Sequence, residues 1–229
     1  MSVQTRVAFD RELRGLQDNL LRMGSLVDSA ISRSLQALAD RNADLARQIV
    51  ADDAQVNALR FQIEEECIKL IATQQPMARD LRTIVAAMNI ITDLERMADH
   101  AAGTARIVLR MGDEPLLKPL IDIPRMTDEC RDMLRLALDA YVRRDAELAR
   151  AVAARDDIID NLYNQIFREL LSFMIEDPRT TTRALYLLLA AHNLERIGDR
   201  VTNIAERVIF MTSGEMKELK TDADLARLR

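Results

Sequence analysis

Apolar residues recur every three or four positions along most of the chain, which is the spacing of one face of an α-helix. The clearest stripe runs from about Val7 to Leu38. Its apolar positions are Leu13, Leu16, Leu20, Met23, Val27, Ile31 and Leu35. The pattern predicts a long first helix, then a turn at Asp40-Arg41-Asn42 in which Asn42 or a neighbour caps the next helix.

Proline and glycine mark the remaining breaks. A second helix is expected to run to about Gln75, and Pro76 then starts a third helix as a first-turn residue. The third helix fades near Met111-Gly112, and 112-GDEPLLKPLIDIP-124 reads as a linker. Further helices are expected over about 125–142, 146–175 and 180–212, with a break at Asp177-Pro178. The polar tail after Gly214 is expected to fray.

The two halves of the chain repeat each other. The segment 42-NADLARQIVADD-53 matches 145-DAELARAVAARD-156 at six of twelve positions, and 94-LERMAD-99 matches 194-LERIGD-199. We therefore predict an all-α fold of two tandem three-helix bundles related by the internal repeat. The expected divisions are a first bundle over 1–112, a linker over 113–124, a second bundle over 125–214 and a tail over 215–229.

Composition narrows the class of protein. The chain has 229 residues, 48% of them hydrophobic, 30% charged and only 3% aromatic, which is a composition typical of long helices. A net charge of −5 without a basic block argues against binding to nucleic acid. Cys67 and Cys130 are isolated, so we expect no disulfide and a reducing compartment. The longest uncharged apolar stretches are far shorter than a membrane span of ~20 residues, so a soluble, cytoplasmic protein is expected.

Pairs of oxygen-bearing side chains four residues apart occur twice in each repeat, and each pair shares a helix face. The pairs are Asp53 with Asn57, Glu95 with Asp99, Asp156 with Asp160, and Glu195 with Asp199. If each helix pair folds back at its break, the midpoints 55 and 97 average 76, and 158 and 197 average 177.5. Both averages fall on a proline break. The pairs are therefore expected to face each other, roughly 30 Å from the turn at ~1.5 Å per residue.

The acidic pairs continue the apolar seam of their helices, so they need compensation for lost hydration. Four converging oxygen ligands can hold a cation, and hard ligands of this kind favour magnesium, manganese or iron, with zinc possible. The alternative is that Arg96, Arg196 and Arg200 neutralise the acids and that no metal binds.

The sequence contains no catalytic or cofactor-binding motif beyond these acids. A carboxylate-bridged di-metal enzyme typically uses Glu-x-x-His, and here only the reversed His192-x-x-Glu195 occurs. Neither a glycine-rich phosphate loop nor a nucleophile motif is present. A metal-free structural dimer also stays open, because 185-LYLLLAA-191 could be a buried seam or a dimer face.

Several segments together resemble the PhoU family of phosphate-transport accessory proteins over essentially the whole chain. They are 23-MGSLVDSA-30, Asp53-x-x-x-Asn57, 75-QPMARDLR-82, 94-LERMAD-99, 176-EDPRT-180 and 194-LERIGDR-200.

The resemblance implies a cytoplasmic, often dimeric, non-enzymatic adaptor that represses the phosphate-starvation (Pho) response and modulates phosphate uptake. It implies as partners the phosphate ABC transporter ATPase PstB and the sensor histidine kinase PhoR, with membrane contact only through partners. Some family members bind multinuclear metal clusters through E/D-x-x-x-D motifs. Carried over, one cluster would use Asp53, Glu95 and Asp99, and the other Asp156, Asp160, Glu195 and Asp199. Asn57 departs from the motif and brings no charge, so the first site is expected to bind metal more weakly.

Overall fold

The computed structural model describes residues 3–215 and residue 219, with side chains described from residue 7. The described residues form helices and their connections, which confirms the all-α prediction. The helices are α1 (Val3–Asp40), α2 (Ala43–Gln74), α3 (Ala78–Met111), α4 (Asp122–Arg143), α5 (Ala146–Ala154), α6 (Asp156–Glu176) and α7 (Thr181–Ser213), with a 3-10 turn η1 (Pro178–Thr180) before α7. The predicted fraying of the tail falls almost wholly outside the described residues.

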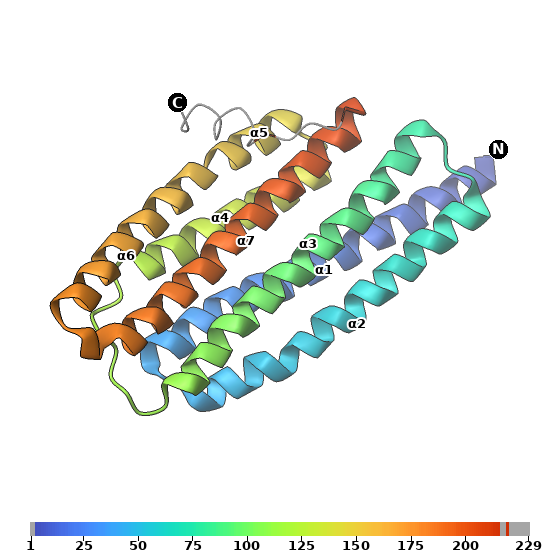
Figure 1. Cartoon of the computed structure of the whole chain (residues 1–229). Helices are drawn as coiled ribbons and strands as arrows, with labels where there is room; N and C mark the ends of the chain where they lie inside the picture. Colours follow the sequence, from blue (N-terminus) through green and yellow to red (C-terminus); the bar gives the residue numbers. More distant parts are fainter. Residues whose placement is uncertain (1–2, 216–218, 220–229) are drawn as a thin grey trace.

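The helices form two bundles that lie side by side (Figure 1). Helices α1, α2 and α3 pack on one another, and α4, α5, α6 and α7 form the second group. The two groups meet where α3 runs along α7 and α1 runs along α4. None of the described helices combines the length and the apolar character that crossing a membrane requires.

Short polar caps set the helix starts. The Asn42 side chain accepts a hydrogen bond from the Leu45 amide at 2.9 Å, which confirms the predicted cap. Its repeat equivalent Asp145 accepts from Leu148 at 3.0 Å. Pro76 was placed wrongly: Gln75 already ends α2 in a left-handed conformation and Met77 is the extended cap of α3, so the proline lies in the connection.

Two other boundaries differ from the expected ones. Helix α4 begins at Asp122 and not at Arg125, because Pro124 is tolerated in the first helical turn. The helix expected over 146–175 is interrupted at Arg155, whose amide bonds to Val152 O at 3.0 Å in a three-residue turn. The Arg155 side chain holds this turn against α4 through Glu129, with Nε–Oε1 and Nη2–Oε2 distances of 2.6 and 2.9 Å.

An ion pair joins the two bundles where α1 meets α4. Arg131 of α4 forms a two-pronged ion pair with Asp28 of α1, at 2.8 and 3.0 Å. Gly24 lets the same two helices approach, because a Cβ atom there would lie 2.3 Å from the Leu138 side chain. The α1–α4 contact is therefore close and ionically tied, so the two repeats are packed as one unit.

Candidate carboxylate site

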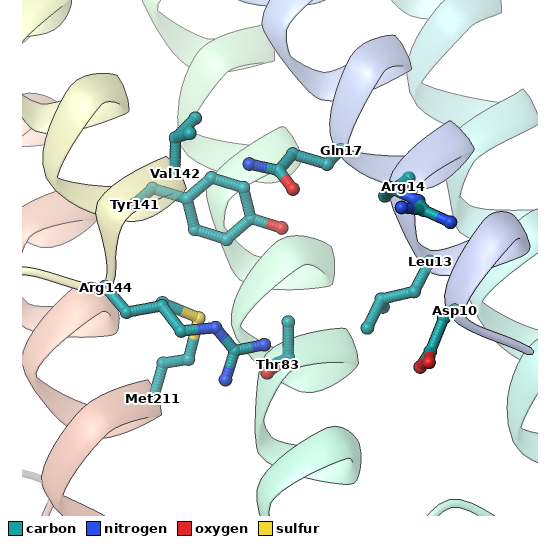
Figure 2. A pocket seen from close by; sticks show the side chains of 9 residues that line it. All are labelled: Asp10, Leu13, Arg14, Gln17, Thr83, Tyr141, Val142, Arg144 and Met211. Carbon is teal, nitrogen blue, oxygen red and sulfur yellow. The ribbon is translucent and has the colours of Figure 1, made fainter. Parts of the chain in front are cut away.

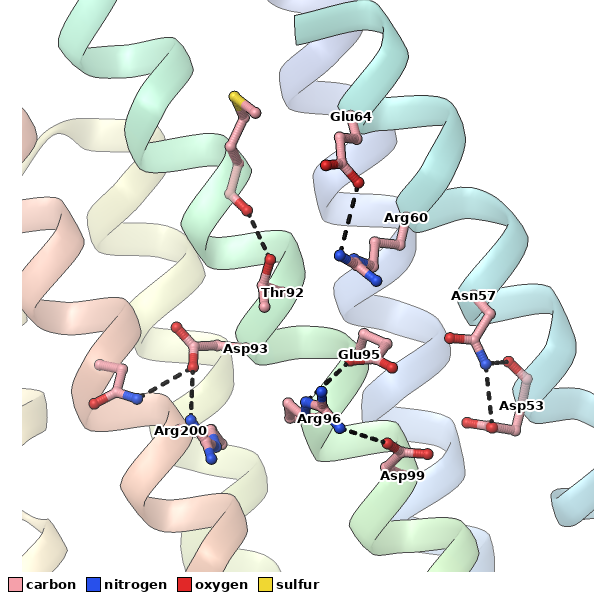
Figure 3. A network of polar contacts seen from close by, with 12 residues as sticks. Asp53, Asn57, Arg60, Glu64, Thr92, Asp93, Glu95, Arg96, Asp99 and Arg200 are labelled. Carbon is pink, nitrogen blue, oxygen red and sulfur yellow. Dashed lines mark hydrogen bonds and ion pairs between the residues drawn. The ribbon is translucent and has the colours of Figure 1, made fainter. Parts of the chain in front are cut away.

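The candidate ligands of the first repeat lie on facing surfaces of α2 and α3. Figure 3 shows Asp53 and Asn57 turned from α2 toward the space in which Glu95 and Asp99 of α3 lie. Asp99 is close enough to Asp53 to raise its pKa by repulsion. The structure therefore brings these two helix faces together in the register that folding back at the proline break predicts.

Burial leaves one carboxylate oxygen of Glu95 and one of Asp53 without a hydrogen bond. Glu95 is only 9% exposed, and its Oε2 atom accepts no hydrogen bond from the described part of the chain. The same holds for Oδ1 of Asp53, while Asn57 donates to Oδ2 at 3.3 Å. Burial first, and repulsion by Asp99 second, raise the pKa of Asp53 above its ordinary value of 3.8. Two buried oxygens from different helices thus accept no hydrogen bond from the described residues, which is the kind of oxygen set that fits a hard cation.

Arg96 is the counter-ion of Glu95 and Asp99, while the charge of Arg106 acts on Asp53. Its Nε lies 3.5 Å from Glu95 Oε2 and its Nη1 lies 3.4 Å from Asp99 Oδ2. Both distances are long for charge-assisted contacts, and more than half of the arginine side chain is exposed. Arg96 therefore offsets the two carboxylates weakly.

The second repeat holds its acids more tightly. Arg196 donates through Nε to Glu195 at 2.5 Å and through Nη2 to the other oxygen of the same carboxylate. Its Nη1 lies 3.0 Å from Asp199, and the negative charge of Asp160 on α6 also acts on Arg196. Three of the four candidate ligands of this repeat therefore act on one guanidinium.

Asp156, the fourth candidate, packs beside the α7 backbone. It is 3% exposed, and a Cβ atom on Gly198 would lie 2.8 Å from its Oδ1. The repeat equivalent of Gly198 is Ala98, and Asp53 opposite it is only half-buried. A missing methyl group on α7 thus lets the second-repeat acid lie deeper than its counterpart.

Among residues 7–215, no three Asp, Glu, His or Cys side chains already lie close enough together to hold a metal ion. What the fold assembles is two helix interfaces, each with acids from both helices and with an arginine beside them. Metal binding by the eight side chains stays a prediction. The expected order of affinity, in which the first site binds more weakly than the second, also stays a prediction. The tighter hold of Arg196 acts against that order, because a cation must compete with it.

Comparison with known proteins agrees with this architecture. A family model described as "PhoU domain" matches residues 20–108 and 123–208, one match for each repeat. The chain belongs to the PhoU family.

Relatives within the PhoU family align over nearly the full length. A phosphate-specific transport system accessory protein PhoU homolog of Zymomonas mobilis is 40% identical over 93% of this chain and 90% of its own. The Pseudomonas aeruginosa homolog is 38% identical over 90% of this chain and 86% of its own.

Two solved structures share the fold. PhoU from Pseudomonas aeruginosa superposes with a TM-score of 0.86 at 37% identity, covering 90% of this chain and 100% of that one. The phosphate transport system regulatory protein PhoU from Streptococcus pneumoniae gives 0.85 at 32% identity, covering 91% and 99%.

Sequence reasoning missed a polar cluster that joins the two LERxxD segments. Asp93 of α3 accepts hydrogen bonds from Asn203 at 3.1 Å and from Arg200 at 3.4 Å of α7 (Figure 3). Its repeat equivalent Asn193 lies with Oδ1 3.3 Å from His100 Nδ1. The repeat offset of 100 residues was the available signal. The residue before Leu94 contacts the residue after Asp199, and the residue before Leu194 contacts the residue after Asp99.

We predict that Asp53→Asn stabilises the metal-free protein at neutral pH. The folded-state pKa of Asp53 is raised, so the folded state binds its proton more tightly than the unfolded chain does. Wild-type stability should therefore fall as pH rises from 3.8 through the folded-state pKa, and the variant should escape this loss. Thermal unfolding in EDTA between pH 4 and pH 8 measures the difference.

The control for this prediction is Asp52→Asn at the neighbouring position. Asp52 forms an ion pair with Arg33 at 2.6 Å, so its replacement removes an attraction and should not stabilise the protein. A destabilised Asp53→Asn protein at pH 7, or equal gains for both variants, would contradict the proposed cost of ionising Asp53.

We also predict opposite outcomes for two glycine-to-alanine changes in helices. Gly15 has nothing within 4 Å of a new Cβ, so alanine there should stabilise the protein by about 1 kcal/mol through helix propensity. Gly198→Ala has the same propensity gain but overpacks Asp156 and Ile159, which costs about 1–3 kcal/mol. In urea unfolding with EDTA, the free energy of unfolding of Gly198→Ala should be lower than that of Gly15→Ala by this overpacking cost. Equal stabilities would mean that α6 does not press on α7 at Gly198.

Proposed function

We propose that this protein is an accessory regulator of phosphate-specific transport that acts by binding and not by catalysis. The observation that carries the proposal is the match to relatives named as phosphate-specific transport system accessory proteins over at least 90% of this chain. The family model matches residues 20–108 and 123–208, so both repeats take part in the likeness.

The finer proposal is that the protein represses the phosphate-starvation response from the cytoplasm. In this proposal it couples the ATPase PstB of the phosphate ABC transporter to the sensor histidine kinase PhoR. It does so as a homodimer. Support for protein binding comes from apolar side chains that are 37–46% exposed on α6 and α7. They are Ile158, Phe167, Leu171, Leu185 and Leu189.

Metal binding to the carboxylates belongs to the same proposal. Asp53, Asn57, Glu95 and Asp99 would hold the ion of the first repeat, and the four equivalent acids that of the second. The two buried first-repeat oxygens without a donor support this assignment. A bound cation would supply positive charge that offsets the repulsion between Asp53 and Asp99, and it would join each helix pair. Arg96 and Arg196 would then be displaced from their carboxylates.

Deletion of the gene should switch on phosphate-starvation genes while phosphate is plentiful, because the proposed repressor is absent. A reporter fused to a phosphate-starvation promoter, read in phosphate-rich medium, measures this effect. A plasmid copy of the wild-type gene should restore repression. Normal repression in the deletion strain would overturn the regulatory proposal.

Elemental mass spectrometry of the untagged protein should find magnesium, manganese, iron or zinc in stoichiometric amounts. A variant with alanine at positions 95, 99, 195 and 199 should lose the metal, because each repeat then lacks its α3 or α7 ligands. Sedimentation of the same samples reports the proposed homodimer.

A matched control removes four surface acids that also pair with arginines on their own helices. They are Asp44, Glu64, Asp139 and Glu147. This control should keep its metal. Equal metal content in both variants, or a metal-free wild type that still represses, would assign the LERxxD acids to arginine pairing alone.

A further inference from the structure

A pocket of about 300 Å³ opens where α1, α3, α4 and α7 meet, away from the carboxylates. Its α3 residue, Thr83, lies twelve residues before Glu95, which is about 18 Å along the helix at ~1.5 Å per residue. Figure 2 shows the lining side chains. They are Asp10, Leu13, Arg14, Gln17, Thr83, Tyr141, Val142, Arg144 and Met211.

Arg144 is the polar centre of this pocket. It ends α4 in a left-handed conformation, with φ 56°, and its amide bonds to Ala140 O and Tyr141 O. Its side chain forms no ion pair or hydrogen bond with the described residues, and Figure 2 shows the guanidinium turned toward Thr83. Burial first, and repulsion by Arg79 second, lower the pKa of Arg144, while attraction by the Asp80 carboxylate opposes the shift. The group nonetheless stays charged at neutral pH, so it is a half-buried cation in need of an acceptor.

The first repeat shows what such an arginine binds. Arg41 lies 103 positions earlier and has the same left-handed conformation, with φ 52°. Its Nη1 donates to Asp113 O at 3.1 Å and to Glu114 O at 3.3 Å, so the linker supplies oxygen acceptors. Arg144 has the same backbone position, but its side chain makes no hydrogen bond to an oxygen of the described residues, and Asp80 acts on it only as a nearby negative charge. A ligand with exposed oxygen atoms would give Arg144 the acceptors that Arg41 finds in the linker.

Other donors face the same space. Figure 2 shows the Tyr141 hydroxyl directed into the pocket between Gln17 and Thr83. Tyr141 is 4% exposed, and burial raises the pKa of its hydroxyl, which therefore stays protonated and able to donate. The Gln17 amide adds a neutral donor, while Arg14 and Asp10, one turn apart on α1, line the opposite rim with opposite charges.

We propose that this pocket binds a small ligand through a phosphate group, with phosphate oxygens on the Arg144 guanidinium and the Tyr141 hydroxyl. A guanidinium fork fits phosphate oxygens in pairs. The phosphate can come as the free ion or as part of a phosphomonoester, because the volume lies at the lower end for small-ligand pockets. Direct binding to the purified chain is independent of the regulatory role proposed above.

The test is isothermal titration of the full chain with inorganic phosphate and, separately, with adenosine monophosphate. EDTA is present so that no metal-bound phosphate contributes, and potassium chloride matches the ionic strength. Saturable binding of at least one ligand is expected. Tighter binding of the monophosphate would identify a phosphomonoester pocket, and equal or tighter binding of the free ion would identify a phosphate pocket.

Variants tie the binding to the named groups. Arg144→Gln should weaken it at least about tenfold, which is the loss expected for one charge-assisted contact. Tyr141→Phe keeps the buried ring and should weaken binding by a smaller factor. The matched control is Arg41→Gln, which alters the equivalent left-handed arginine outside the pocket and should bind as the wild type does. Circular dichroism and the melting temperature confirm that each variant is folded.

Three results would overturn the proposal. The first is no saturable binding of either ligand up to about 10 mM, a tenfold excess over a millimolar Kd. The second is unchanged binding by folded Arg144→Gln. The third is equal binding of adenosine, which lacks the phosphate group.

Discussion

The contact between α3 and α7 is the constraint on which the rest of the structure depends. Each helix carries one LERxxD segment, and the two run beside each other between the bundles. Asp93 reaches Arg200 and Asn203, while Asn193 reaches His100 and, through its amide, Thr104 at 3.3 Å. These polar groups are buried or half-buried. Leaving one of them unpaired costs more free energy of folding than its hydrogen bond contributes. The crossing therefore specifies one register of α3 against α7 more than it adds stability.

That register decides what the carboxylates can do. Leu94 and Leu194 are buried in the core, so the neighbouring Glu95 and Glu195 are drawn to the edge of the seam and toward α2 and α6. The two glutamate carboxylates are then not fully solvated. In each motif the arginine that follows the glutamate offsets its charge. The arginine is a largely exposed counter-ion at long contact distances in the first repeat and a tightly bonded one in the second. Helix packing thus places negative carboxylates where a cation or a guanidinium must neutralise them.

Much of this could be predicted from sequence, because it rests on period and repetition. The apolar stripe, the Asn42 cap and the facing of Asp53 by Asp99 follow from helical spacing and from folding back at Pro76. The interruption at Arg155 could not be predicted, since it depends on a tertiary ion pair with Glu129. Nor could the depth of Asp156, which is set by one absent methyl group at Gly198. Local pattern predicts elements, whereas long-range partners decide where an element bends and how deeply an acid is buried.

The differences between the repeats are as informative as their likeness. A duplicated bundle begins with two copies of every contact. A position at which only one repeat retains the contact therefore indicates that the residue in the other repeat has a different role. Arg41 and Arg144 share a backbone conformation that costs a non-glycine residue about 1 kcal/mol, yet only Arg41 bonds to oxygens of the described chain. Keeping a strained, half-buried cation without such a bond is unfavourable in isolation. The cost is balanced if Arg144 serves a ligand as Arg41 serves the linker.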